Sequence, residues 1–486
     1  MLLVENIKII IKKCMKQSKL IIADFLLICF IIINFVGLFI KPVYDYNDIP
    51  VFLKNNIIDF FSLLLFIIIY YLLLNRIIRD NYILKRILLC MFLIFSIIYI
   101  YSVPLDVFSD MKMIFKGSEY ICDGSFYKLR SDPYFNMCPN NLAICFFYGL
   151  LMKITCKTIF VIKLANIVFI FLINLAITEI TKLFYDKTSS LCILLYSYTY
   201  IPVFLYINHV YSDIPFVLLT AFSVYLYLKN KTFLCFLILS LAYLLRPTAM
   251  IFVIAFVLDS VIQHKNIKNS IYGLLLFLFI IKAYSVLISK FMLNDEFSLP
   301  IWSYIYIGFN KNKFGFQDGS HLYTRNIYDV LERLKSYSFT DCGKIMLKKI
   351  FWTWNEGTYQ VGRYAFGADV MACKDKFLYE TILTKYFLNS SQCGRQILTS
   401  VMRGQYIAVF IGVIINWIFD KRKIYNVINL LFLGTFLFYC IWEIKSRYLL
   451  HLYPYMLVMA YMGYKEISIY FVKFLKKEGK KSYGSV

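Results

Sequence analysis

Long apolar runs recur along almost the whole chain, and they constrain its fold more than any other feature. The first covers Leu20 to Ile40, and the next follow after short basic links. A helix of about 20 apolar residues spans the hydrocarbon core of a bilayer, which is roughly 30 Å thick. Because 60% of the 486 residues are hydrophobic and 19% are aromatic, the composition excludes a soluble globular protein. We therefore predict an all-α polytopic membrane protein.

The basic residues indicate how the chain is oriented in the membrane. The net charge is +23, and Lys and Arg gather in the short links, as they do in cytoplasmic loops. We interpret this charge as a topology signal and expect the lipid bilayer, not a nucleic acid, as the partner. The basic leader before Leu20 and the Lys-rich tail after Tyr464 predict a plasma-membrane protein with both termini in the cytoplasm. The first run lacks a small-residue cleavage site, which favours a retained helix over a signal peptide.

Twelve transmembrane helices account for the apolar runs. Pro247 follows Arg246 within one long run, which we interpret as a hairpin of two short helices with its bend near the outer side. The run from Asn141 to Thr155 is short for a span, so we expect an interfacial or re-entrant helix there. The predicted spans are about 20–40, 57–75, 87–103, 159–177, 191–207, 216–228, two within 233–262, 271–288, 407–419, 427–442 and 448–464.

Two polar stretches interrupt this series, and the helix count places both outside. The first is Pro104 to Asn141, and the second is Ser289 to about Met402. The second contains Lys and Arg, but long loops can be translocated regardless of their positive charge, so we expect it to form an extracytoplasmic subdomain. The predicted parts are a leader with two accessory helices (1–86), a transmembrane core with the first outer loop (87–288, loop 104–141), the outer subdomain (289–402), the C-terminal helices (403–464) and a basic tail (465–486).

Charged residues from separate parts of the chain fall on the predicted outer face. They are Asp106 and Asp110 in the first outer loop, Asp213 at the start of a later span, and Glu443, Arg447 and Tyr448 before the last span. Charged groups are costly where they face lipid, so their recurrence on one side favours a shared polar cavity. A carboxylate accepts the proton of an acceptor hydroxyl, and a guanidinium holds the charge of a departing phosphate. The combination predicts transfer of a group away from a phosphate.

The order of these segments resembles the GT-C glycosyltransferases, and especially the bacterial protein mannosyltransferase and aminoarabinose transferase-like members. The similar segments are SDMKMIFKGSEY, YFNMCPNN, VYSDIPFVLL, LLRPTAMIF and EIKSRYLLHLYPYMLVMA, within residues 87–464. Two helices precede the family's usual first span, and Cys138 stands where an aromatic residue is expected. The resemblance implies an integral-membrane hexosyl- or pentosyltransferase that moves a sugar from a polyprenyl-phosphate donor to an extracytoplasmic acceptor, with inversion. The acceptor would be a cell-surface glycan, a lipid-linked glycan or a protein.

The resemblance also implies roles for the acidic residues. Asp110 matches the catalytic base, and Asp106 is its close rival. Each is alternatively a solvated loop acid, and Asp110 is alternatively a favourable residue at a helix N-terminus beside a capping Ser109. Asp213 would bind the acceptor or assist the base, or else cap the helix ahead of Pro215.

The basic and aromatic residues have roles implied in the same way. Arg447 would hold the lipid phosphate, with Tyr448 beside it and Glu443 orienting the guanidinium; the alternative is an interfacial ion pair. Arg246 would be a second phosphate contact or a snorkelling surface residue. A sugar or acceptor platform or, more simply, a set of interfacial anchors would be formed by Trp352, Trp354, Glu356 and Tyr359.

Other functions and ligands stay open at this stage. A flippase or exporter, or a polymerase, of lipid-linked saccharides would also need a basic cavity. Transporters often have repeated halves, whereas the two outer loops here are unequal, which favours an enzyme. The histidines are dispersed, so no metal site is assigned. A divalent metal stays open as a cofactor because some members of the family use one. Cys122 and Cys138 could form a disulfide outside the cytoplasm.

Overall fold

A computed structural model describes most of the chain. The described residues are 21–44, 50–75, 81–184, 190–263, 266–292, 299–316, 324, 326–365, 377–389, 392–419 and 426–482. Helices dominate these ranges, and the only sheet within them is one two-stranded hairpin. The helical class predicted from the sequence is therefore confirmed.

Four of the described helices are long and apolar enough to cross a membrane. They are α3 (Tyr82–Ser102), α8 (Ile159–Lys182), α14 (Ile267–Phe291) and the part of α19 from Gly394 to Phe419. A fifth span results if the bent pair Leu191–Tyr198 and Ile201–Asn208, which meet at 55°, is one crossing. Six apolar helices of 10–17 residues accompany them within the described ranges. A membrane-embedded protein follows from these helices.

The N-terminal region contains the hairpin that the sequence analysis did not predict. The first described helix runs from Ile21 to Gly37 and so ends before the predicted limit at Ile40. Strands β1 (Ile40–Tyr44) and β2 (Pro50–Lys54) then pair antiparallel before α2 (Ile57–Asn75). Arg403 of α19 fixes this junction, because its guanidinium donates hydrogen bonds to the carbonyl oxygens of Gly37 and Ile40 at 2.8 and 3.0 Å.

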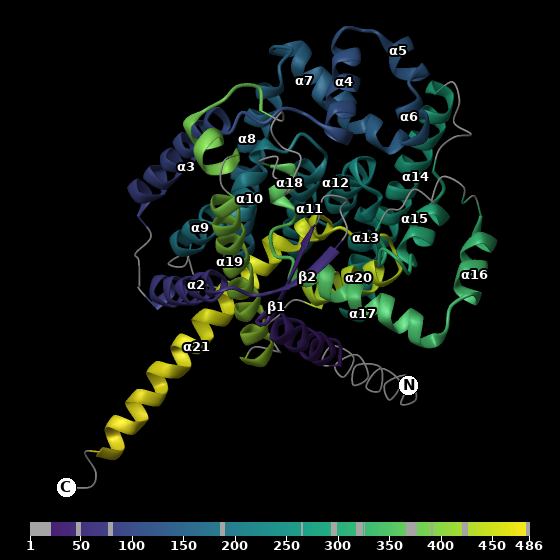
Figure 1. The fold of residues 1–486 in the computed structure, drawn as a ribbon. Helices are drawn as coiled ribbons and strands as arrows, with labels where there is room; N and C mark the ends of the chain where they lie inside the picture. The colour runs from purple at the N-terminus through teal and green to yellow at the C-terminus, as the bar shows by residue number, and fades with distance from the viewer. Residues whose placement is uncertain are drawn as a thin grey trace, which may run out of the picture.

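Residues 104–154, which comprise the polar stretch from Pro104 to Asn141 and the short apolar run after it, fold into a group of short helices. They are α4 (Ser109–Cys122), α5 (Phe126–Ser131), α6 (Pro133–Met137), η1 (Pro139–Asn141) and α7 (Leu142–Ile154). Helices α4 and α7 pack closely, and glycine permits this approach. A Cβ at Gly117 would lie 2.9 Å from the Cys145 sulfur, and one at Gly149 would lie 2.7 Å from the Ile121 side chain. In Figure 1 this group lies at the top, and the last helix, α21, extends away at the opposite end. Cys122 and Cys138 are both free thiols.

The central helices follow the predicted order. They are α8, α9 (Ser190–Tyr198), α10 (Ile201–Leu205), η3 (Tyr206–Asn208), α11 (Asp213–Leu228), α12 (Thr232–Leu245), η4 (Pro247–Ala249), α13 (Met250–Gln263) and α14. The long run predicted to break at Arg246 and Pro247 does so, because proline cannot donate the hydrogen bond that would continue α12.

The region 289–402 shares the core of the membrane helices. Its described elements are α15 (Ile301–Gly308), α16 (Ile327–Lys335), α17 (Phe339–Asn355), α18 (Val361–Tyr364), η7 (Leu383–Asn389) and the start of α19 (Gln392–Phe419). Trp352, Trp354 and Tyr359 are each 1% exposed within the main hydrophobic cluster. They are therefore core residues, not the exposed anchors or sugar platform considered from the sequence.

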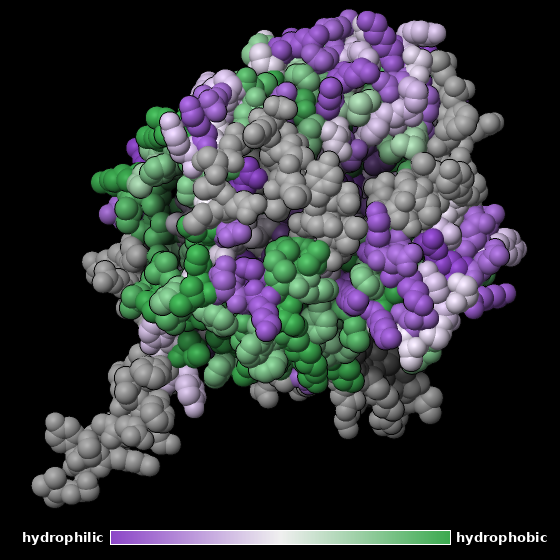
Figure 2. Space-filling view, in the orientation of Figure 1, coloured by the Kyte–Doolittle hydropathy of each residue, from purple (hydrophilic) through white to green (hydrophobic). Residues whose placement is uncertain are grey.

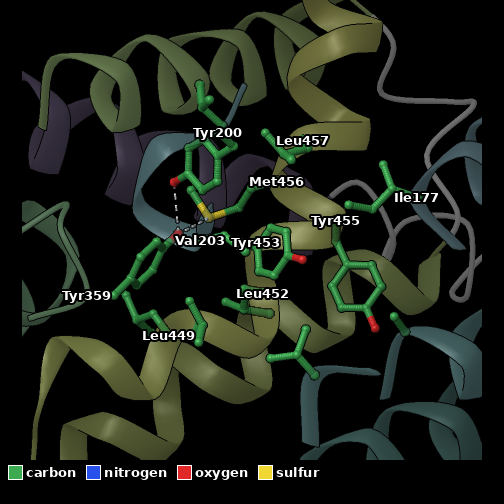
Figure 3. Close-up of a cluster of buried hydrophobic side chains, with 14 of the residues drawn as sticks. Ile177, Tyr200, Val203, Tyr359, Leu449, Leu452, Tyr453, Tyr455, Met456 and Leu457 are labelled. Atoms are coloured by element: carbon green, nitrogen blue, oxygen red, sulfur yellow. Dashed lines mark hydrogen bonds between the residues drawn. The ribbon is translucent and has the colours of Figure 1, made fainter. Parts of the chain in front are cut away.

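The C-terminal elements complete this core. They are α20 (Asn426–Ile441), η8 (Ser446–Leu452) and α21 (Tyr453–Ser482). Figure 3 shows where they meet the central helices: the hydroxyls of Tyr200 and Tyr359 lie 3.2 Å apart beside Met456. Lys349 of α17 joins α15 to the end of α20 by donating to the carbonyls of Gly308, Cys440 and Trp442 at 2.8–2.9 Å.

The surface divides into an apolar and a polar part. Figure 2 shows hydrophobic residues gathered around α2 and α3, and hydrophilic residues over α4 to α6 and over α16 and α17. Large apolar side chains on α3 are exposed, among them Phe95 at 55% and Ile98 at 53%. Such a surface suits contact with lipid hydrocarbon.

Candidate functional site

Asp213 is the centre of a buried charged cluster formed by three separate segments. It is the first residue of α11 and is 1% exposed. Its Oδ2 atom lies 2.6 Å from Nη2 of Arg246, 2.9 Å from Nε2 of His209 and 4.0 Å from Nη1 of Arg447. Arg246 follows the last residue of α12, and Arg447 belongs to η8. A carboxylate so placed compensates two guanidinium groups that would otherwise be buried at high cost.

Aromatic rings hold the two guanidinium groups in place. The Arg447 guanidinium carbon lies 4.5 Å from the centroid of the Tyr364 ring and 4.9 Å from that of Tyr211. The Arg246 guanidinium carbon lies 5.5 Å from the same Tyr211 ring, and its Nε donates to the Ser212 hydroxyl at 3.0 Å. Cation–π contacts of this kind are worth more when they are desolvated. Tyr211 is thus shared by both arginines.

Several polar atoms of this cluster have no hydrogen-bond partner in the described part of the chain. They are Oδ1 of Asp213, Nε of Arg447 and Nδ1 of His209. A buried polar atom without a partner is costly unless water or a ligand satisfies it. The cluster therefore keeps hydrogen-bonding capacity for another molecule, while its charged groups are already oriented.

The cluster is joined to the polar segment 104–141 through Tyr211. The hydroxyl of Tyr211 donates to Oδ1 of Asn141 at 3.4 Å, and the amide nitrogen of Asn141 donates to the Tyr134 hydroxyl at 2.8 Å. Asn141 and Tyr134 are the two ends of the YFNMCPNN segment. The structure thus brings this segment and the VYSDIPF segment together.

Asp110 lies in the same neighbourhood, in the first turn of α4. Burial raises the pKa of the Cys138 thiol to about 12, and the charges of Asp110 and Glu443 contribute to this rise. Burial and then the Asp110 charge also raise the pKa of Tyr211. Asp110 is half-buried, and in the described ranges its carboxylate makes no hydrogen bond or ion pair. It is a free carboxylate within electrostatic reach of the arginine cluster.

The turn that presents Asp110 has an unusual backbone. Ser109 has φ of 50°, in the left-handed region that residues other than glycine and asparagine seldom adopt. The N-cap residue is Phe108, and no side chain caps the helix. Ser109 is therefore not the cap considered from the sequence. Strained residues of this kind often occur where a side chain must be aimed at a ligand.

Asp106 has a different environment. Its Oδ1 accepts a hydrogen bond from the backbone N–H of Val107 at 2.7 Å. The adjacent residue, Leu105, accepts a hydrogen bond at 2.7 Å from the ammonium group of Lys163, which is fully buried in α8. Lys163 also interacts electrostatically with Asp106. Asp106 is thus partly held by its surroundings, whereas Asp110 is not.

Glu443 and Tyr448 form a pair beside the cluster. The Tyr448 hydroxyl donates to Oε1 of Glu443, and the Tyr448 ring lies 5.6 Å from the Arg447 guanidinium carbon. Among the described residues, the carboxylate within 4.0 Å of Arg447 belongs to Asp213, not to Glu443. The orientation of the guanidinium that was expected from Glu443 therefore comes from Asp213.

Sequence reasoning missed three parts of this site: His209, Tyr211 and Tyr364. His209 is four residues before Asp213, and both were visible in the polar segment NHVYSDIP. Burial lowers the pKa of His209, although the neighbouring Asp213 raises it in part. Tyr364 carried no signal, because its place under Arg447 depends on long-range packing.

The described residues contain no group of three or more His, Cys, Asp or Glu side chains that could hold a metal ion. Only the carboxylate of Asp213 and the imidazole of His209 are adjacent in the cluster, and two guanidinium groups neighbour them. This donor set suits an anion better than a divalent cation.

Comparisons with protein-family models, with characterised proteins and with solved structures found no match to this chain.

Proposed function

We propose that the protein is an integral-membrane glycosyltransferase of the GT-C type, which moves a sugar from a polyprenyl-phosphate donor to an extracytoplasmic acceptor. The observation that carries this proposal is the convergence at Tyr211. There the buried Asp213, Arg246 and Arg447 cluster meets the first outer loop, which presents Asp110. A fixed anion-binding group and a free carboxylate within reach of each other are what transfer from a phosphate requires.

The arginines bind and stabilise the phosphate. When the bond between the anomeric carbon and the phosphate oxygen breaks, its electron pair goes to the phosphate. The guanidinium of Arg447, with its unpartnered Nε, neutralises that charge, and Arg246 assists it. Asp213 is already paired with Arg246 and His209, which favours an orienting role over acceptor binding.

Asp110 accepts the proton of the acceptor hydroxyl as its oxygen attacks the anomeric carbon. A base must be free to take up a proton, and the Asp110 carboxylate has no competing partner in the described chain. One displacement with one base inverts the configuration at that carbon. Asp106 is the rival base, but its carboxylate already accepts a hydrogen bond from the backbone N–H of Val107.

The proposal includes a topology of twelve spans with both termini in the cytoplasm. It requires that the six shorter apolar helices and the first part of α21 cross the membrane beside the longer spans. Helices α4 and α7 then lie on the outer surface, at the opposite end from α21 (Figure 1). This arrangement would place Asp110 on the outer face with the donor phosphate.

The proposal is tested with full-length protein reconstituted in lipid vesicles. A panel of polyprenyl-phosphate sugars with a labelled sugar is supplied, and release of polyprenyl phosphate is measured with glycan, lipid and peptide acceptors. We expect cleavage of at least one donor by the wild-type protein. Movement of an intact donor between leaflets without cleavage would instead support a flippase, and elongation of a lipid-linked glycan would support a polymerase.

A cysteine-accessibility measurement tests the topology separately. Asp110→Cys, in a variant that lacks Cys90 and Cys156, the exposed cysteines among those that the structure describes, should react with an impermeant thiol reagent from outside the cell. Labelling only from the cytoplasmic side would overturn the proposed orientation and, with it, the extracytoplasmic acceptor.

A further inference from the structure

Glu443 is a buried carboxylate to which the proposed mechanism gives no part. It is 7% exposed, and its Oε1 accepts the hydrogen bond from the Tyr448 hydroxyl. Its other oxygen, Oε2, accepts no hydrogen bond from any residue that the structure describes, and it is not sealed from solvent. A carboxylate oxygen has lone pairs for more than one hydrogen bond. Glu443 can therefore accept a hydrogen bond from a bound molecule without losing Tyr448.

The aromatic ring of Tyr304 lies next to Glu443 and is held by other rings. The Glu443 backbone N–H donates to the Tyr304 carbonyl at 3.1 Å. The Tyr304 ring stacks on Trp442 with centroids 5.1 Å apart and planes at 8°, and Trp442 stacks on Phe438 at 4.9 Å. Among the described residues Tyr304 is the last ring of this stack, and it is partly exposed. Its negative π face suits the polarised C–H groups of a sugar ring.

Helix α15, which carries Tyr304, lies between the α4–α6 group and α20 (Figure 1). At its start, the backbone N–H of Leu299 donates to the carbonyl of Met137 in α6 at 3.1 Å. Burial raises the pKa of the Tyr304 hydroxyl, and the negative charges of Glu443 and Asp110 add to this rise. The ring is therefore near two carboxylates from separate segments of the chain.

Tyr448 connects Glu443 to the arginine cluster. Its hydroxyl donates to Glu443, and its ring lies 5.6 Å from the Arg447 guanidinium carbon. A sugar joined to a phosphate on Arg447 would thus be placed toward Glu443 and Tyr304. An acidic sugar would bring a further carboxylate beside Glu443 and Asp110, and like charges brought together in a partly buried site repel strongly.

We infer that Tyr304 and Glu443 form the subsite for the transferred sugar, and that this subsite selects a neutral sugar against the corresponding uronic acid. The Tyr304 ring packs against the C–H face of the sugar, and Oε2 of Glu443 accepts a hydrogen bond from one of its hydroxyls. The inference rests on the proposed function for the phosphate-linked donor. It adds the class of sugar and two residues that recognise it.

Binding to the full-length protein in lipid nanodiscs tests the charge preference, whether or not a donor is cleaved. The probes are short polyprenyl phosphates that carry glucose, galactose or mannose, each paired with its uronic acid. We expect the neutral member of at least one pair to bind at least about tenfold more tightly, and Glu443→Gln to reduce this preference at least about fivefold. Glu119→Gln is the matched control, because it makes the same change of charge near the other end of α4, where Glu119 lies 3.7 Å from Lys157.

The ring is tested separately with Tyr304→Leu and the sugar-free polyprenyl phosphate. We expect this variant to bind the preferred neutral donor about tenfold more weakly and the sugar-free lipid within about twofold of wild type, because the ring contacts the sugar alone. Tyr304→Phe keeps the ring and should bind like wild type. Trp302→Leu is the control on the same helix, since Trp302 is also partly exposed but stacks on no described ring.

Equal affinity for both members of every pair, or tighter binding of the uronic acids, would overturn the charge preference. Equal loss of the sugar-free lipid in Tyr304→Leu would overturn the subsite, because the ring would then only support the fold. If Tyr304→Leu does not fold, Glu443→Gln still decides. The expected binding without cleavage of any donor would support this subsite and refute the proposed transfer. Cleavage with unchanged KM and unchanged preference in both variants would do the reverse.

Discussion

The buried cluster around Asp213 and the start of α4 around Asp110 both place carboxylates in the candidate site, but they hold them differently. Asp213 is 1% exposed and lies within 4.0 Å of two guanidinium groups and an imidazole. Asp110 is half-buried, and its carboxylate has no ion pair or hydrogen bond in the described chain. Charged partners hold the first carboxylate in place, whereas no described side chain holds the second.

This difference separates a residue that maintains the site from one that reacts in it. A buried carboxylate between two guanidinium groups is a poor base, because protonation would leave both cations uncompensated. This carboxylate is nevertheless important for stability, because its removal would also leave both guanidinium groups without a compensating charge. A carboxylate without partners contributes little to folding and can be replaced at small cost. We therefore predict that substitution of Asp213 lowers stability strongly, whereas substitution of Asp110 lowers activity and leaves stability nearly unchanged.

The largest effect on activity is expected from Arg447→Gln. Removal of a preorganised hydrogen-bond donor that stabilises developing charge commonly lowers kcat by about 10²–10³-fold. Arg447 combines an unpartnered Nε with contacts to two aromatic rings. The change in kcat is measured as the rate at which the purified protein cleaves the polyprenyl-phosphate sugar. Arg447→Lys keeps the charge but loses the planar guanidinium, so its kcat should lie between those of Arg447→Gln and the wild-type protein. Lys445→Gln is the neighbouring control, and equal loss there would mean that overall positive charge matters and not this guanidinium.

The largest effect on stability is expected from Asp213→Asn. The substitution removes the buried carboxylate and leaves Arg246 and Arg447 uncompensated, which costs about 3–5 kcal/mol in the free energy of unfolding. Thermal unfolding in detergent measures this change. Asp123→Asn is a matched control, because Asp123 is 47% exposed and pairs with Lys157 at 2.7 Å on the surface. Its cost should stay within about 1 kcal/mol. Similar stability for the two variants would contradict the buried ion cluster.

A smaller, pH-dependent effect is expected from His209. Burial lowers its pKa in the folded protein, so the unfolded chain binds the additional proton first as the pH falls. The stability that this residue contributes is therefore complete above about pH 6.5, the ordinary value, and is lost below it. The slope is at most about 1.4 kcal/mol per pH unit. His209→Gln should flatten the unfolding free energy between pH 6.5 and pH 5 relative to wild type, and an unchanged slope would refute this assignment.

Sequence periodicity predicted the position of several apolar helices, because apolar runs and Pro247 act locally, but only four or five of the twelve predicted spans are helices long enough to cross a membrane within the described ranges. The starts of α2 and α8 and the break after Arg246 were found to within a few residues. The hairpin of β1 and β2 was missed, because its stability depends on distant partners such as Arg403. Burial of Trp352 and Trp354 was missed for a similar reason, since an aromatic segment between spans has the same composition whether it faces the membrane surface or the core.

The sequence indicated which charged residues belong to the candidate site, but not which of them pair with one another. Asp213, Arg246 and Arg447 were each identified, yet neighbouring sequence placed Glu443 beside Arg447, whereas the fold places Asp213 there. Pairing across elements requires the packing of α11, α12 and η8, which no local pattern encodes. His209 was within reach of sequence reasoning, because it precedes Asp213 by only four residues.

The central claim is that Asp110 exchanges the proton and the Asp213 cluster holds the phosphate. It is tested most directly by donor turnover at saturating substrate for Asp110→Asn, beside Asp106→Asn, with thermal unfolding of the same preparations. The account predicts that Asp110→Asn lowers kcat by about 10²–10⁴-fold while the unfolding free energy changes by no more than about 0.5 kcal/mol, and that Asp106→Asn has the smaller effect on kcat. Wild-type turnover by Asp110→Asn, or a larger loss for Asp106→Asn, would contradict it.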